Sequence, residues 1–156
     1  MAQVMYGVST GAAPFTSTTA VQTVLAIVNA ATDCGVQIKK FRIAFNGVTA
    51  ANPPVTVRFF TTNNATAGTS SASTITQTSG RSIVFTNITA AQQYTAELTT
   101  KTYVGEEFLL TPNGGTVIYD YPLGDEPDIG ISSSYGMEIT ASVAVGVSAA
   151  FSFTRI

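Results

Sequence analysis

The largest concentration of chemically useful side chains is an acidic loop in the last third of the chain. Asp120, Asp125, Glu126 and Asp128 lie in or beside a segment bounded by two prolines, residues 122–127. Carboxylate oxygens are the ligands that Ca²⁺ prefers, so these four acids are candidate ligands of a structural cation, although their spacing does not match an EF-hand loop. Paired carboxylates can also hydrolyse glycosides across a cleft. The interpretation that we favour is simpler: solvated acids, or acids at a subunit contact.

Most other catalytic chemistry lacks the residues that it needs. The chain contains no histidine and no tryptophan, and Cys34 is its only cysteine. Without histidine there is no Ser-His-Asp or Cys-His nucleophilic site, and one thiol builds neither a zinc site nor an internal disulfide. No strand–loop–helix segment carries a glycine-rich phosphate-binding fingerprint. We therefore expect a protein that binds and packs, with no enzymatic activity and no cofactor.

A basic cluster and two tyrosines are candidate contact residues. Lys39, Lys40 and Arg42 lie close together on one predicted strand. They either protect a charged edge strand from aggregation or pair with the acidic loop of another copy. Tyr119 and Tyr121 share one face of the strand that leads into the acidic loop, so they are candidates for an exposed contact pair. The full set of candidate interface residues is Lys39, Lys40, Arg42, Tyr119, Tyr121, Leu123, Asp125 and Glu126.

Composition and charge restrict the possible partners. Of the 156 residues, 45% are apolar and only 10% are charged, and the net charge is −2. This balance gives no general attraction to nucleic acid, and no apolar run approaches the roughly 18 residues of a membrane helix. Residues 1–105 hold six bases and two acids, whereas residues 106–156 hold seven acids and one base. The asymmetry favours head-to-tail contact between copies, unless both halves interleave in one sandwich and the charges mix.

Alternation of apolar and polar residues predicts the elements that position these side chains. The clearest strand covers residues 145–154, and another covers residues 55–61. In residues 36–45 the alternation changes phase at Lys39-Lys40, which predicts a β-bulge or a change of sheet. Residues 19–29 fit a strand or a helix, and their β-branched side chains favour the strand. Further strands are predicted at residues 92–100, 107–111, 116–121 and 137–143.

The remaining segments complete the predicted architecture. Residues 62–80 are rich in small hydroxylated side chains, which predicts a long exposed loop. Turn sequences separate the strands at intervals of roughly 8–12 residues, as in sandwiches and barrels. We therefore predict a single all-β domain, an antiparallel, jelly-roll-like β-sandwich over residues 19–156. An N-terminal arm over residues 1–18, without the features of a signal peptide, is expected to become ordered on a neighbouring protein.

Several packing and turn motifs resemble those of small, jelly-roll virion proteins of tailed bacteriophages. The motifs are Phe41-x-Ile43-x-Phe45-Asn46-Gly47, Pro54-Val55-x-Val57, Ala67 to Ala72, Pro112-x-Gly114-Gly115, Tyr121 to Gly124 and the final alternating strand. Over most of residues 36–156 the chain is similar to capsid decoration, or cement, proteins. The resemblance implies a homotrimer that binds the major capsid protein on the outside of the virion, stabilises the shell and is assembled in the bacterial cytoplasm.

The jelly roll also occurs in receptor- and carbohydrate-binding virion modules such as head fibres and tail tips. Fold alone therefore does not separate these functions. Exposed aromatic side chains beside the acidic loop would favour carbohydrate as the partner. Burial of that loop between subunits would favour the decoration role.

Overall fold

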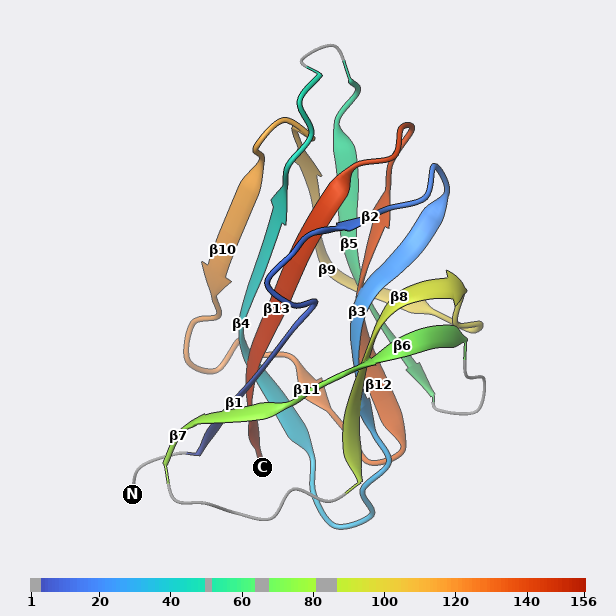
Figure 1. The fold of residues 1–156 in the computed structure, drawn as a ribbon. Helices are drawn as coiled ribbons and strands as arrows, with labels where there is room; N and C mark the ends of the chain where they lie inside the picture. Colours follow the sequence, from blue (N-terminus) through green and yellow to red (C-terminus); the bar gives the residue numbers. More distant parts are fainter. Residues whose placement is uncertain (1–3, 50–51, 64–67, 81–86) are drawn as a thin grey trace.

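The computed structural model describes residues 4–49, 52–63, 68–80 and 87–156, and every regular element in these ranges is a β-strand (Figure 1). Two antiparallel sheets pack face to face and form one domain. None of the described residues belongs to a helix that could span a membrane. The predicted all-β sandwich is confirmed.

The two sheets are unequal in strand number and are called sheet A and sheet B. Sheet A has seven strands. Five of them lie side by side in the order β10 (Thr116–Asp120), β4 (Val36–Phe45), β13 (Gly146–Arg155), β1 (Met5–Ser9) and β7 (Thr76–Ser79). The other two are β2 (Phe15–Thr16), which pairs with β13, and β11 (Asp128–Ile129), which pairs with β4. The six strands of sheet B are β6 (Thr69–Ser73), β8 (Ile88–Ala96), β3 (Val21–Asn29), β12 (Ser133–Thr140), β5 (Val55–Asn63) and β9 (Thr102–Leu110).

Eight of these strands have the pairing of a jelly roll. In that architecture the chain resembles one long hairpin wrapped around an axis, so the first strand pairs with the last, the second with the penultimate, and so on inward. Here β1 pairs with β13, β3 with β12, β4 with β10 and β5 with β9, all antiparallel. Pairing of β13 with β4 and of β12 with β5 completes two four-stranded sheets.

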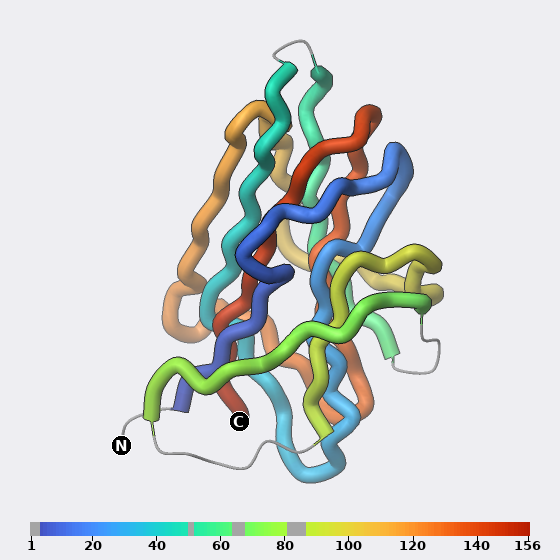
Figure 2. The backbone as a smooth tube through the Cα atoms, viewed as in Figure 1, coloured from blue at the N-terminus to red at the C-terminus, as the bar shows by residue number. Residues whose placement is uncertain are grey.

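The segment between β5 and β9 adds three strands to this framework. β8 extends sheet B beyond β3, and β6 pairs with β8. β7 follows shortly after β6 and pairs with β1, so residues 69–79 cross from one sheet to the other (Figures 1 and 2). The predicted loop over residues 62–80 is therefore wrong, because backbone pairing orders β6 and β7 although their side chains are mostly exposed. Residues 64–67 of that prediction lie outside the described residues.

The predicted N-terminal arm is largely part of the sandwich. β1 lies between β13 and β7, and the side chains of Tyr6 and Val8 are buried in the core. β2 also pairs with β13. Because Met5 lies opposite Thr154, the start of β1 and the end of β13 lie at the same end of sheet A (Figure 2). The arm predicted over residues 1–18 is corrected accordingly, and residues 1–3 lie outside the described ranges.

The alternation located most strands correctly. Residues 21–29 form a strand and not a helix. The phase change at Lys39-Lys40 is a β-bulge, since Ser152 pairs with Lys40 and the next residue, Phe153, pairs with Ile38. The strands predicted at residues 92–100, 107–111 and 137–143 begin earlier than expected, at Ile88, Thr102 and Ser133 respectively.

The main core lies between the sheets and is rich in aromatic side chains. Phe41, Phe59, Tyr135, Phe151 and Phe153 are almost completely buried. The rings of Phe41 and Phe59 come from opposite sheets, and their centroids lie 4.6 Å apart. Each large side chain buried in this way contributes about 1.5–3 kcal/mol relative to exposure.

A smaller apolar cluster covers the outer face of sheet B. Ala26, Gly136 and Phe60 are neighbours across β3, β12 and β5, and Tyr94 and Leu98 pack on this part of the sheet. A Cβ atom at position 136 would collide with the Phe60 ring. Glycine is therefore required there for close packing.

A buried ionic network lies beside this cluster. The Lys101 ammonium group lies 2.5 Å from a carboxylate oxygen of both Glu138 and Glu97. The Tyr103 hydroxyl donates to Glu138 over 3.0 Å, and the Thr23 backbone N–H donates to Glu97 over 2.8 Å. Burial disfavours the charged form of Lys101, but its hydrogen bonds to the two carboxylates outweigh burial and raise its pKa. The network fixes the segment after β8 to sheet B.

Candidate functional site

The acidic loop contains a well-defined turn. The Asp125 backbone N–H donates to the Pro122 carbonyl over 3.0 Å, and Gly124 has a φ of 99°. These features define a type II turn, in which the third residue needs a positive φ and is usually glycine. The Gly124 N–H also donates to the Glu126 carboxylate over 2.6 Å. Leu123, at the second position of the turn, is 94% exposed.

Both ends of this turn are fixed to β4. The Tyr121 N–H donates to the Lys39 carbonyl, and the Ile38 N–H donates to the Pro127 carbonyl, each over 2.9 Å. The Lys39 ammonium group lies 2.9 Å from the Glu126 carboxylate. This hydrogen bond is the main reason that the pKa of Glu126 lies below its ordinary value. The turn is therefore a rigid feature of the surface.

The basic cluster pairs with the acidic loop of its own chain. β4 lies between β10 and β13, so the prediction of a charged edge strand is wrong. Lys39 contacts Glu126, and Lys40 contacts its cross-strand partner Asp120 at 3.3 Å. Arg42 is the one member of the cluster that has no carboxylate partner among the described residues. Pairing of this cluster with the acidic loop of another copy was one prediction. Both lysines instead pair with acids of their own chain.

The hypothesised cation site is not formed by these acids. In the part of the chain that the structure describes, no group of three or more Asp, Glu, Cys or His side chains is placed to hold a metal ion. Asp120 and Glu126 instead contact lysines, and Asp128 belongs to β11. Asp125 is the last residue of the turn. The candidate ligands Asp120, Asp125, Glu126 and Asp128 therefore do not converge.

An aromatic pocket opens where the two sheets end, between β9 of sheet B and β10 of sheet A. Its volume is about 330 Å³, and six rings line it: Phe41, Phe59, Phe108, Tyr119, Tyr121 and Tyr135. Pockets that bind small molecules have a similar character, with apolar walls and few polar groups. Tyr119 is 40% exposed, and the centre of its ring lies 5.1 Å from that of Tyr121. Of the two candidate tyrosines, Tyr119 is thus exposed, whereas Tyr121 packs against the core.

Two carboxylate residues, Glu106 and Asp125, also line this pocket. Asp125 comes from the type II turn. Glu106 reaches the pocket because β9 bulges: residues 105–107 lie opposite the single residue Arg58 of β5. Gly105 has a φ of 74° at the start of the bulge, a conformation in which glycine is favoured. The position of each carboxylate residue therefore depends on a glycine with a positive φ, Gly105 in the bulge and Gly124 in the turn.

These two carboxylates differ from most acids of the protein in their lack of a cationic partner. Six acids form ion pairs: Asp33, Glu97, Glu107, Asp120, Glu126 and Glu138. Among the described residues, the acids without an ion-pair partner are Glu106, Asp125 and Asp128, and two of these three line the pocket. None of the described residues that line it is basic. The pocket consequently combines aromatic walls with uncompensated negative charge.

Two tyrosines of the pocket, Tyr121 and Tyr135, do not contribute charge at neutral pH. The hydroxyl oxygens of Tyr121 and Tyr135 lie 3.3 Å apart and share a hydrogen bond. Burial raises the pKa of both phenols. Among the described lining residues, the acidic side chains are Glu106 and Asp125.

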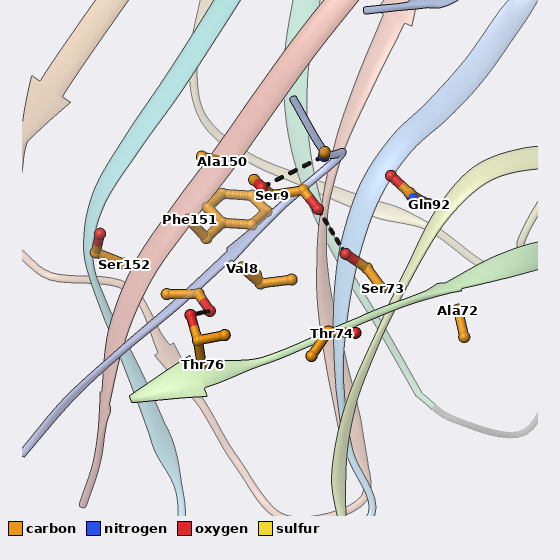
Figure 3. Close-up of a pocket in the computed structure, with 12 residues that line it drawn as sticks. Val8, Ser9, Ala72, Ser73, Thr74, Thr76, Gln92, Ala150, Phe151 and Ser152 are labelled. Atoms are coloured by element: carbon orange, nitrogen blue, oxygen red, sulfur yellow. Dashed lines mark hydrogen bonds between the residues drawn. The ribbon is translucent and has the colours of Figure 1, made fainter. Parts of the chain in front are cut away.

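A second depression, of about 540 Å³, lies where residues 69–79 cross between the sheets (Figure 3). It is wide and open, and its lining consists mostly of glycine, alanine and hydroxylated residues, with Val8, Gln92 and Phe151; none of the lining residues that the structure describes is charged. The Ser73 hydroxyl donates to the Ser9 carbonyl over 2.6 Å across one side of it. The Gln92 side-chain oxygen is buried without a hydrogen-bond partner among the described residues. Because it is more open and its described lining carries no charge, this depression is a weaker candidate than the aromatic pocket.

The sequence predicted only part of the pocket. Tyr119, Tyr121 and Asp125 were candidate contact residues, whereas Glu106 and Phe108 were not. One signal was available for Glu106, because a glycine inside a strand, here Gly105, is typical of a bulge.

The geometry defines the class of protein as a jelly-roll β-sandwich that carries an acidic, aromatic pocket. Comparison of the chain with protein-family models, curated proteins and solved structures finds no match. The particular function must therefore be argued from the geometry.

Proposed function

We propose that this chain is a structural virion protein that binds the outside of a phage capsid as a homo-oligomer, with a homotrimer as the expected form, and stabilises the shell. The observation that carries the proposal is Leu123, whose side chain is 94% exposed on a rigid turn. A leucine held in water in this way is unfavourable in the isolated chain. Contact with another protein would remove that apolar surface from water, which is worth about 1.5–3 kcal/mol for one side chain.

The surrounding surface has the same apolar character. It comprises β9, β10 and residues 121–128, and we call it the open side because both sheets end there. Nine large apolar side chains are exposed among the described residues, and five of them lie on the open side: Tyr103, Leu109, Ile118, Tyr119 and Leu123. Such a concentration is typical of a surface that contacts other proteins.

Two further features support an assembly role. β9 and β10 are each the terminal strand of a sheet, and terminal strands can pair with a strand of another chain. Only 10% of the residues are charged, and six of the nine acids are already paired within the chain. The resemblance of the turn and strand motifs to capsid decoration proteins favours the major capsid protein and other copies of this chain as partners.

Replacement of Leu123 with aspartate tests the proposal. We expect the wild-type protein to form trimers in light-scattering measurements and to coat expanded capsids that lack it. Leu123→Asp is expected to lower capsid affinity at least about tenfold, because burial of a leucine exceeds the 1.4 kcal/mol that a factor of ten requires. Val48→Asp is the matched control, since Val48 is 92% exposed and lies outside the open side.

The proposal would be wrong if Leu123→Asp assembled and coated capsids at wild-type occupancy. Circular dichroism would verify that both variants fold, which is expected because both positions are exposed. Equal losses in both variants would also contradict the specific role of the open side.

A receptor- or carbohydrate-binding virion module is the second candidate. One observation favours it: Tyr119 is exposed at a pocket that Asp125 also lines. An aromatic face beside hydrogen-bond acceptors can bind a sugar ring. A glycan array would test this candidate, with Tyr119→Ala expected to abolish binding that Leu123→Asp leaves intact. Absence of any bound glycan would count against it.

A further inference from the structure

We propose that the aromatic pocket between β9 and β10 is a binding site for an organic cation, an ammonium or guanidinium group on a short apolar stem. This inference does not depend on the proposed capsid role. It rests on three properties of the pocket: its unpaired carboxylates, its aromatic walls and the absence of basic side chains from its described lining.

The charge of the lining selects a cation. Within the part of the chain that the structure describes, Glu106 and Asp125 are two of the three acids without an ion-pair partner, and no basic residue lines the pocket. Two carboxylates near an apolar cavity produce a negative potential that favours a positively charged ligand. A ligand with a neutral or negative head group would leave this charge uncompensated.

The walls of the pocket suit the same ligand. Aromatic faces attract ammonium and guanidinium groups that lie within about 6 Å of the ring centre. The chain makes such contacts elsewhere: the Arg58 guanidinium lies 4.6 Å from the Tyr103 ring centre, and the Lys101 ammonium lies 4.6 Å from that of Phe60. The pocket has six rings, but none of its described lining residues is basic.

Other ligand classes fit less well. A metal ion needs several converging ligands, and the described residues provide no group of three. A neutral sugar needs hydrogen-bond donors as well as acceptors. The polar side chains of the lining are two carboxylates and three tyrosines, and the hydroxyl groups of Tyr121 and Tyr135 are bonded to each other. The volume of about 330 Å³ accommodates a group of the size of choline.

Binding can be measured with choline and methylguanidinium as probes on the full-length protein in low-salt buffer. The neutral control is 3,3-dimethylbutanol, in which carbon replaces the choline nitrogen. Calorimetry and the aromatic NMR resonances of the pocket are expected to show saturable binding of at least one cation, with a Kd of about 1 mM or lower. The neutral alcohol is expected to bind at least about tenfold more weakly, since it lacks the electrostatic attraction.

Neutral variants test the role of the carboxylates. Glu106→Gln combined with Asp125→Asn is expected to raise the Kd at least about tenfold, because both carboxylate charges are removed while size is kept. Asp128→Asn is the matched control, since Asp128 is the third unpaired acid and does not line the pocket. All three positions are exposed, so the variants are expected to fold.

Several results would overturn the inference. They are equal affinity for choline and its neutral isostere, an unchanged Kd in the doubly neutral variant, or no saturable binding of either cation. Binding of a neutral sugar in preference to the cations would favour the carbohydrate-binding alternative instead. Failure of capsid binding would leave this inference untouched, because the measurements use the isolated protein.

An additional variant identifies the source of the cation. Arg42 is the described base without a carboxylate partner, so another copy could supply its guanidinium group. If it does, Arg42→Gln is expected to weaken self-association and to leave the pocket more accessible to choline. If the natural ligand is a free small cation, Arg42→Gln leaves both measurements unchanged.

Discussion

Replacement of Lys101 with methionine tests whether the buried ionic network holds the segment after β8 on sheet B. Methionine keeps most of the length and apolar surface of lysine but removes the ammonium group. Glu138, whose side chain is 1% exposed, would then lose its cationic partner at 2.5 Å. It would keep the Tyr103 hydroxyl at 3.0 Å and the Arg58 guanidinium at 3.9 Å.

The expected cost follows from this geometry. Removal of one partner of a buried ion pair destabilises a protein by about 3–5 kcal/mol, because the other charge is left buried. The two remaining partners of Glu138 place the expected loss near the lower end, at about 3 kcal/mol. For a chain of this size, that corresponds to a fall in Tm of about 6–12 °C.

Urea denaturation followed by circular dichroism measures this loss directly. Lys40→Met is the matched control, because the Lys40 and Asp120 side chains are 40% and 71% exposed. Exposed pairs of this kind contribute about 0–1 kcal/mol. A loss in Lys101→Met no larger than that in Lys40→Met would refute the reasoning.

The same network gives a pH dependence of definite sign. The pKa of Lys101 is raised above its ordinary value of 10.5 in the folded protein. Its stabilising contribution is therefore complete below pH 10.5 and is lost as the pH rises through the folded-state pKa. Wild-type protein is expected to lose more stability over this pH range than Lys101→Met, which keeps the alkaline loss that arises from buried tyrosines such as Tyr121 and Tyr135.

Two further predictions concern the acidic turn and the first strand. Since hydrogen bonds lower the pKa of Glu126, its stabilising contribution is present above its ordinary pKa of 4.5 and is lost as the pH falls through the folded-state pKa. The Gly124 amide proton bonds to this carboxylate, so its NMR shift is expected to follow the protonation, and a shift independent of acid pH would contradict the assignment. Removal of residues 1–9 is expected to cost about 3–6 kcal/mol from the burial of Tyr6 and Val8 alone, which thermal denaturation would measure. An unchanged Tm would show that this strand is dispensable.

Strands that bury one face could be predicted from the sequence, because the side chains that point to the core are apolar and alternate with those that point away. β13 alternates buried and partly exposed residues over most of its length, and β5 begins in the same way. The bulge at Lys39-Lys40 was predictable for the same reason, since one extra residue reverses the phase. β6 and β7 show no such alternation, because nearly all of their side chains are exposed. These two strands are defined by backbone pairing with β8 and β1.

The candidate site was only partly predictable because its residues come from distant parts of the chain. Tyr119, Tyr121 and Asp125 are close in sequence, so their proximity could be inferred. Glu106 and Tyr135 reach the same pocket only through the pairing of β9 and β12 with β5. The Lys101 network has the same origin, since no local pattern connects Lys101 with a glutamate in β12.

The crossing of residues 69–79 between the sheets has a mechanical consequence. Because this stretch is hydrogen-bonded to β8 in one layer and to β1 in the other, the layers cannot separate along that flank without breaking backbone ladders. Relative rotation of the layers would then have its axis near this flank and its greatest amplitude at the opposite one, where β9 and β10 lie. A guest between Tyr119 of one layer and Phe108 of the other would lie far from that axis, where a given force opposes the rotation with the largest torque.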